Sequence, residues 1–207
     1  MKKIFLLSIT FISVLEGLAQ DNIIPLEQFS AESISLNDYY KDVNGVLDKF
    51  VGTWIYDDGT TYFKVVFQKK ERNSAINDWD NTPIYFDQLV ANFELKLNGV
   101  TVYNNLNSTD NYLIHDGHRL YNLNRKIKLF YSESDNIYTD SYYNNYSLHR
   151  STLELTYQPD LTNIIDQLLW NRITFNGKEL IDTSNYLIGQ QDSTPYQIPP
   201  NMLLTKQ

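Results

Sequence analysis

The chain has 207 residues, a formal net charge of -8 at neutral pH and no cysteine. An acidic chain disfavours nucleic acid and anionic lipid surfaces as partners. The absence of cysteine excludes disulfides, thiolate metal sites, a cysteine nucleophile and a lipidated cysteine, so the fold must be held together by burial. The length is sufficient for one hydrophobic core, and beyond the first 19 residues no stretch is long and apolar enough to predict a membrane span.

The N-terminal segment has the pattern of a secretory signal peptide. Two lysines, Lys2 and Lys3, precede an apolar run from Ile4 to Leu15, and a small residue, Ala19, follows shortly after. A basic start, an apolar stretch of about a dozen residues and a small residue before the cleavage point are typical of such signals. We therefore expect residues 1–19 to be removed and the protein to be exported to the periplasm, the cell surface or the medium.

Residues 20–49 show no clean hydrophobic period and are predicted to be a leader, with a short helical turn between Asn37 and Gly45. A single domain, residues 50–207, is expected to follow. It begins with a predicted hairpin whose strands, 51–56 and 60–69, flank an Asp-Asp-Gly turn. The polar interval 71–82 is predicted to be a loop, with Trp79 as a lid, a sugar-stacking platform or a plain cover for one end of the fold.

Further strands follow in hairpin order. Residues 83–97 alternate apolar and polar side chains and are joined by Asn98-Gly99 to a strand at 100–103. A third hairpin is predicted around Asp116-Gly117, with strands at 112–115 and 118–123. Later strand patterns cover 126–131, 148–157, 164–175 and 201–207. We predict an all-β fold, an antiparallel up-and-down meander of 8 to 10 strands, which closes into a barrel because closure removes the exposed edges.

With the strands in place, two resemblances become informative. Gly52-Thr53-Trp54 at the start of the first strand resembles the lipocalins and the wider calycin group. In that group the Trp closes the barrel floor and a basic residue from the last strand covers its ring, which implies that role for Lys206. The whole chain is also similar to a family of small exported proteins of unknown function from Gram-negative bacteria. That similarity rests on Ala19-Gln20, Gly52 to Trp54, Lys69-Lys70 and Pro199 to Gln207.

Apolar residues on the inward faces of four predicted strands are the candidate ligand-binding set, because a barrel of eight or more strands has room for a small apolar molecule. These residues are Phe63, Phe67, Phe93, Leu95 and Trp170, with Leu153 and Leu155 beside them. The alternative is that they form a packed core. We therefore consider a non-enzymatic binder of a small apolar or amphipathic molecule, and alternatively a surface interaction or glycan-contacting protein with a solid barrel and Tyr/Asn-rich loops.

Motifs for catalysis and metal binding are weak. His115 and His118 flank the predicted Asp-Gly turn and would face each other, but no third ligand is evident, so we predict no metal site. The sequence contains none of the common nucleophile, zinc-protease or phosphate-binding motifs, and Glu94 and Glu154 are predicted to point outward. We predict no catalytic residue and no cofactor.

Overall fold

The computed structural model describes residues 21–30, 34–76, 83–109, 112–131, 137–140, 145–148, 151–159, 165–172, 174–175, 178–179 and 197–207. Within these ranges the chain is β-structure, turns and one short 3-10 helix, η2 (Leu26–Gln28). The predicted signal peptide, residues 1–19, lies outside the described residues.

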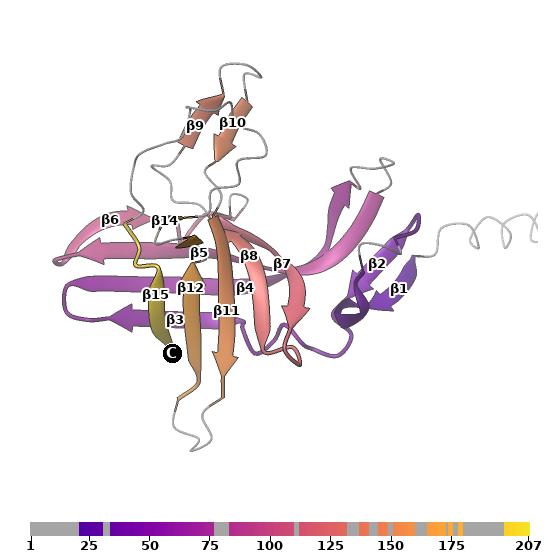
Figure 1. Cartoon of the computed structure of the whole chain (residues 1–207), viewed down its shortest axis with the longest axis horizontal. Helices are drawn as coiled ribbons and strands as arrows, with labels where there is room; N and C mark the ends of the chain where they lie inside the picture. The colour runs from indigo at the N-terminus through magenta and orange to yellow at the C-terminus, as the bar shows by residue number, and fades with distance from the viewer. Residues whose placement is uncertain are drawn as a thin grey trace, which may run out of the picture.

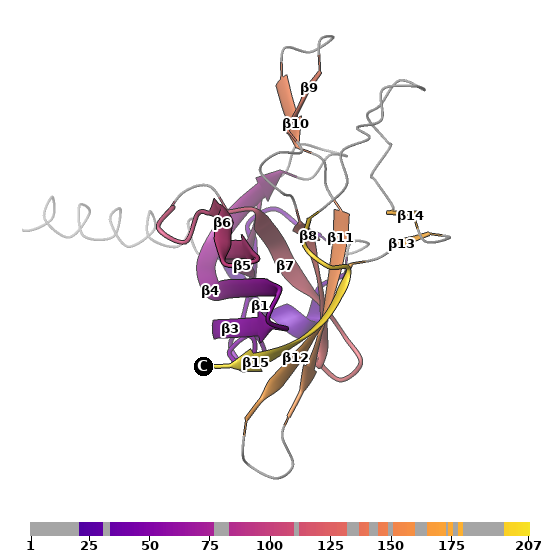
Figure 2. The same ribbon diagram turned by 90° about the vertical axis from the view of Figure 1, so that its left-hand side faces the viewer.

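Eight strands form a closed antiparallel barrel in which neighbours around the barrel are also neighbours along the chain (Figures 1 and 2). They are β3 (Gly52–Asp57), β4 (Thr61–Ile76), β5 (Pro83–Leu97), β7 (Ile114–Tyr121), β8 (Lys126–Tyr131), β11 (Ser151–Gln158), β12 (Gln167–Arg172) and β15 (Asn201–Lys206). Pairing of β5 with β7 completes the circle. This confirms the predicted all-β meander and its closure.

Within the described residues, seven further strands lie outside that circle: β1 (Asn22–Pro25), β2 (Asp38–Lys41), β6 (Val100–Asn104), β9 (Ile137–Asp140), β10 (Asn145–Leu148), β13 (Thr174–Phe175) and β14 (Lys178–Glu179). The β9–β10 and β13–β14 pairs are separate two-stranded sheets. In Figure 1 the β9–β10 pair stands above the barrel, at the end where β8 and β12 finish.

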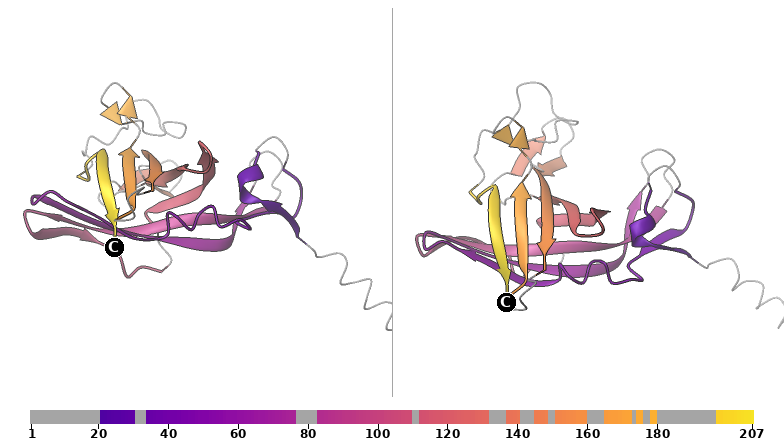
Figure 3. Two further views of the ribbon diagram at one scale, coloured as in Figure 1. Left: turned by 90° about the horizontal axis from the view of Figure 1, so that it is seen from below. Right: turned by 60° about the horizontal axis from the view of Figure 1, so that its bottom comes forward.

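Strand β5 organises the sheet because three different strands pair along one of its edges. β4 pairs along the whole of the other edge, from Pro83 to Leu97. On the shared edge β2 pairs at Tyr85 and Phe86, β7 between Leu89 and Ala91, and β6 from Glu94 onward. The part of the β4–β5 hairpin that extends past the barrel therefore carries β2 and β1, as Figure 3 shows.

The leader contributes strands where we predicted a helical turn, and that prediction is wrong. β2 runs parallel to β5, and β1 runs parallel to β2. The buried carboxylate of Asp87 on β5 holds β2 in place: the Tyr39 hydroxyl donates to Oδ1 at 2.6 Å and the backbone N–H of Asp42 donates to Oδ2 at 2.9 Å. β2 is only four residues long, and its partner β5 lies more than 40 residues away in the sequence. The leader therefore shows no hydrophobic period that would predict this strand.

The predicted loop after residue 70 is also wrong in its first half, because β4 continues to Ile76. The pairing register shifts between Lys70 and Asn73, and Arg72 adopts a left-handed backbone with φ 49°. Its backbone N–H donates to Asp87 Oδ1 at 3.0 Å and its guanidinium lies 4.0 Å from the centroid of the Tyr85 ring. Residues 71–75 are mostly exposed, so the apolar alternation that marks a half-buried strand is missing.

The third predicted hairpin is wrong as well. Asp116-Gly117 lies inside β7, at an irregularity between His115 and Arg119, and the turn to β8 falls at residues 122–125. Three consecutive residues there have positive φ, at Asn122, Leu123 and Asn124. Gly117 instead lies against β5: an added Cβ would be 2.8 Å from both Leu89 Cβ and the Leu89 carbonyl oxygen. The glycine is needed for strand approach and not for a turn.

Gly117→Ala is expected to lower the free energy of unfolding by about 2 to 3 kcal/mol, because one of the contacts is to backbone that has no alternative rotamer. Urea unfolding followed by far-UV circular dichroism measures this. Gly59→Ala serves as the control: nothing lies within 4 Å of its added Cβ, so only the left-handed φ of 86° is strained, at a cost of about 1 kcal/mol. A stability for Gly117→Ala equal to that of the parent protein would contradict the closure described above.

Candidate functional site

The residues named by the lipocalin resemblance lie together at one end of the barrel, which we call the floor. Trp54 is fully buried and its indole N–H donates to the Phe50 carbonyl oxygen at 2.8 Å. Lys206, which pairs with Trp54 across β15 and β3, holds its Nζ 5.3 Å from the centroid of the indole ring. Gly52 has φ 123°, and an added Cβ there would be 3.3 Å from Lys206 Cε. The floor is thus a hydrogen-bonded, cation-covered plug.

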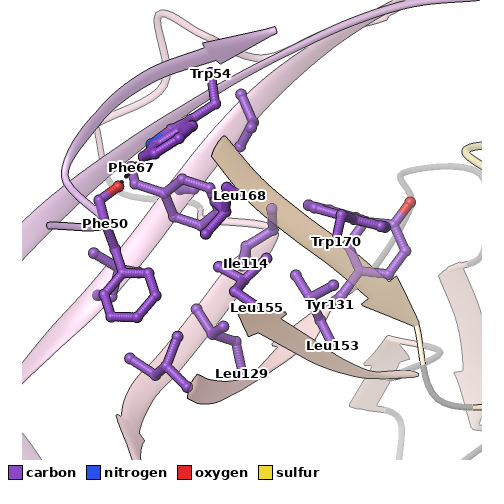
Figure 4. Packing of buried hydrophobic residues seen from close by; sticks show 14 of the residues in the cluster. Phe50, Trp54, Phe67, Ile114, Leu129, Tyr131, Leu153, Leu155, Leu168 and Trp170 are labelled. Carbon is purple, nitrogen blue, oxygen red and sulfur yellow. Dashed lines mark hydrogen bonds between the residues drawn. The ribbon is translucent and has the colours of Figure 1, made fainter. Parts of the chain in front are cut away.

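The five predicted ligand-binding residues are all buried, but they do not form one group. Phe67 pairs with Gly52 and lies beside Trp54 at the floor (Figure 4). At the opposite end of the barrel, Phe63 meets Trp170 edge-on at 5.0 Å between ring centroids. Phe93 lies 5.5 Å from Phe63, and Leu95 is directly opposite Phe63 in the β4–β5 pairing.

Two residues that sequence reasoning missed complete this second group. The ring of Tyr131 on β8 is buried and lies 5.4 Å from that of Trp170, nearly perpendicular to it (Figure 4). Arg172 follows Trp170 by two residues on β12, is only 3% exposed, and its guanidinium carbon lies 5.8 Å from the Tyr131 ring centroid. The period of two along residues 168–172 is the signal that would have found the arginine. We call Phe63, Phe93, Tyr131 and Trp170 the ring cluster.

The two buried indoles differ in one respect. Trp54 donates its N–H to a carbonyl at the floor, whereas the Nε1 of Trp170 is buried and has no hydrogen-bond partner among the residues that the structure describes. A buried donor without an acceptor costs about 1–3 kcal/mol, and native proteins rarely leave one unpaired. The ring cluster therefore contains a buried indole donor that no described residue accepts from.

The barrel wall has few ladder pairs beside this donor. β15 pairs with β12 over five residues, and Met202 lies opposite Trp170 in that pairing. By contrast β15 pairs with β3 only at Thr205 and Lys206, both at the floor. From Met202 to Leu204, therefore, β15 has no ladder partner on the β3 side next to the ring cluster.

The predicted histidine pair is not brought together for metal binding. His118 stacks on Phe86 with centroids 4.5 Å apart, while His115 faces Phe130 and its Nδ1 lies 3.1 Å from the Asp116 carboxylate. No group of three metal-binding side chains occurs among the described residues. Glu94 accepts a hydrogen bond from Asn104 and pairs with Lys96, and Glu154 pairs with Lys126, so both carboxylates have partners of their own.

Four tyrosines outside the core carry a cation over their rings. The distances from the cation to the ring centroid are 4.0–5.5 Å, and the pairs are Lys96 with Tyr62, Arg72 with Tyr85, Lys70 with Tyr112 and Lys128 with Tyr121. These cations compete with a sugar for the same ring faces. Trp79 and the Tyr142-Tyr143 pair, on which the glycan alternative depends, lie outside the described residues.

Comparison with known proteins places the chain in a family. A model described as a family of unknown function (DUF6705) matches residues 1–207. The chain belongs to this family. Searches of curated proteins and of solved structures found no significant match to this DUF6705 member. Among the residues that the structure describes, no helix has the length and apolar character needed to cross a bilayer.

In this DUF6705 barrel, Trp54→Ala should reduce the free energy of unfolding by about 3 to 5 kcal/mol, because it empties a fully buried indole site and leaves the Phe50 carbonyl without its donor. Lys206→Met keeps most of the stem over the ring and removes the charge, so we expect a cost of about 1 kcal/mol or less. Chemical denaturation of both variants measures the difference. A loss below 1 kcal/mol for Trp54→Ala would show that the floor is not structural.

Proposed function

We propose that this protein is an exported, non-enzymatic carrier with a lipocalin-like barrel, which binds a small amphipathic anion at the ring cluster. The observation that carries the proposal is the Trp170 indole N–H, a buried donor with no acceptor among the described residues. A ligand that accepts this hydrogen bond removes the cost of leaving the donor unpaired.

The charge of the ligand is inferred from Arg172. Arg172 is 3% exposed and its guanidinium carbon lies 5.8 Å from the centroid of the Tyr131 ring. An anionic group beside a buried guanidinium adds to the interactions that stabilise its positive charge. A carboxylate, sulfate or phosphate oxygen can accept from the indole and interact with the guanidinium at the same time, since the two side chains lie on the same face of β12. The head group of the ligand is therefore expected to be anionic.

The apolar part of the ligand is inferred from the side chains next to that donor. Phe63, Phe93 and Leu95 present rings and methyl groups, and burying apolar surface contributes about 25 cal/mol for each Å² removed from water. The ring centroids of the cluster lie 5.0–6.1 Å apart, so the rings already contact one another inside the barrel. We therefore place the ligand at this end of the barrel and not along the whole length of the barrel. We propose that the ligand reaches Trp170 beside Met202, where β15 has no ladder pairing with β3.

Export rests on the sequence pattern of residues 1–19, with two lysines, an apolar run and Ala19. We propose that the signal is cleaved after Ala19 in a Gram-negative host and that the carrier acts outside the cytoplasm. Intact-mass measurement of protein recovered from a periplasmic or secreted fraction tests this: the mature chain is expected to start at Gln20. Recovery of the full-length chain from the cytoplasm alone would contradict export.

Calorimetric titration with dodecanoate tests the carrier function. The anion is expected to bind with one site, and dodecyltrimethylammonium, with the same chain length and the opposite charge, is expected to bind at least about tenfold more weakly. Arg172→Gln should remove most of that preference, and Trp170→Phe should weaken dodecanoate binding about 2- to 10-fold by deleting one hydrogen bond.

Arg119→Gln is the matched control, because Arg119 is an exposed arginine on β7 away from the ring cluster. It should leave the titration unchanged. Equal affinity for the anion and the cation, or an effect of Arg119→Gln as large as that of Arg172→Gln, would overturn the proposal.

A further inference from the structure

A surface pocket of about 220 Å³ lies between the leader and the barrel, away from the ring cluster. The leader supplies Leu26 and Glu27 from η2 together with Phe29, and β7 supplies residues 118–121. Pockets that hold drug-sized ligands have volumes of about 300–1,000 Å³. This one is smaller, so its volume suits a molecule about the size of a single ring.

One wall of the pocket is an imidazole held by aromatic rings. His118 stacks on Phe86 with centroids 4.5 Å apart and planes at 24°, and meets the edge of Phe29 at 5.3 Å. Burial lowers its pKa to about 4, so the ring is neutral at pH 7 and has one N–H donor and one nitrogen acceptor. No hydrogen bond joins these nitrogens to any residue within the described ranges. The wall therefore combines an aromatic surface with unused hydrogen-bonding capacity.

The remaining walls are mainly apolar, and the charged groups near them are engaged or exposed. Leu26 is 1% exposed, and Leu120 is half-buried. The Glu27 carboxylate accepts a hydrogen bond from the Asn44 side-chain amide. Arg119 is exposed, and the ring of Tyr121 already carries Lys128 at 5.1 Å from its centroid. The two charged side chains of the lining, Glu27 and Arg119, are exposed and opposite in sign, whereas His118 is neutral and the leucines are apolar, so the pocket favours a neutral ligand over an ion.

We propose that this pocket is a second binding site, specific for a small uncharged aromatic molecule that carries one hydroxyl or N–H group. The aromatic ring packs against Leu26, Phe29 and Leu120, and the polar group pairs with a ring nitrogen of His118. Because its walls come from both the leader and β7, an occupied pocket also fixes the leader to the barrel. The site is independent of the anionic ligand proposed for the ring cluster.

Phenol is the probe, with cyclohexanol as a ligand of the same size and hydrogen-bonding group but without the aromatic ring. Both are titrated into isotope-labelled protein, with the leucine methyl and imidazole signals followed by NMR. Phenol is expected to give saturable shifts at Leu26, Leu120 and His118, with an affinity at least about fivefold above that of cyclohexanol. Arg172→Gln, which alters the ring cluster, should leave these shifts unchanged.

Two variants test the assignment, and a third is the control. His118→Phe keeps the aromatic stacking and removes both nitrogens, so phenol binding should weaken about tenfold. Leu120→Trp fills the pocket and should abolish the shifts even if His118→Phe impairs folding. His115→Phe changes a histidine on the same strand that does not line the pocket and should have no effect. Phenol shifts that persist unchanged in Leu120→Trp, or the absence of saturable shifts in the parent protein, would overturn the proposal.

Discussion

Closure of the barrel depends on how closely β7 approaches β5. Only two residue pairs join these strands, Leu89 with Gly117 and Ala91 with Ile114. The β5 residues of the two pairs, Leu89 and Ala91, are fully buried, and Gly117 on β7 has no space for a side chain. This short junction leaves the rest of the β5 edge for β6 on one side and β2 on the other. The leader can therefore join the sheet because β5 is long and pairs with β7 over only a short stretch.

The two ends of the barrel have different chemistry although both contain a buried tryptophan. At the floor the Trp54 indole donates to the Phe50 carbonyl, Lys206 covers the ring, and the first and last strands pair. At the other end Trp170 keeps an N–H without an acceptor in the described part of the chain, Arg172 brings a buried charge, and β15 does not pair with β3. The plug at the floor stabilises the fold, whereas the opposite end is where we propose that the ligand binds.

Local patterns were sufficient to place the strand at residues 83–97 and its Asn98-Gly99 turn, although β5 is buried on both faces from Phe86 to Phe93 and not on one face as the alternation predicted. They failed at Gly117, because a glycine required for strand approach looks the same in sequence as one required for a turn. They also failed in residues 122–125, where the turn contains no glycine, and in the leader, whose parallel partner is distant in sequence. For the site, alternation indicated Trp170, but the role of Arg172 depends on Tyr131 from another strand, which one sequence does not reveal.

The hydrogen-bonding state of the Trp170 indole is the most direct test of the account. In nitrogen-15 NMR spectra the Trp54 indole serves as an internal reference, since its N–H already donates to Phe50, and Trp170→Phe assigns the signal of interest. Addition of dodecanoate is expected to move the Trp170 indole proton downfield, as a new hydrogen bond forms, and to leave that of Trp54 in place. A Trp170 signal that is unchanged at saturating dodecanoate would contradict the assignment of this donor as the ligand's partner.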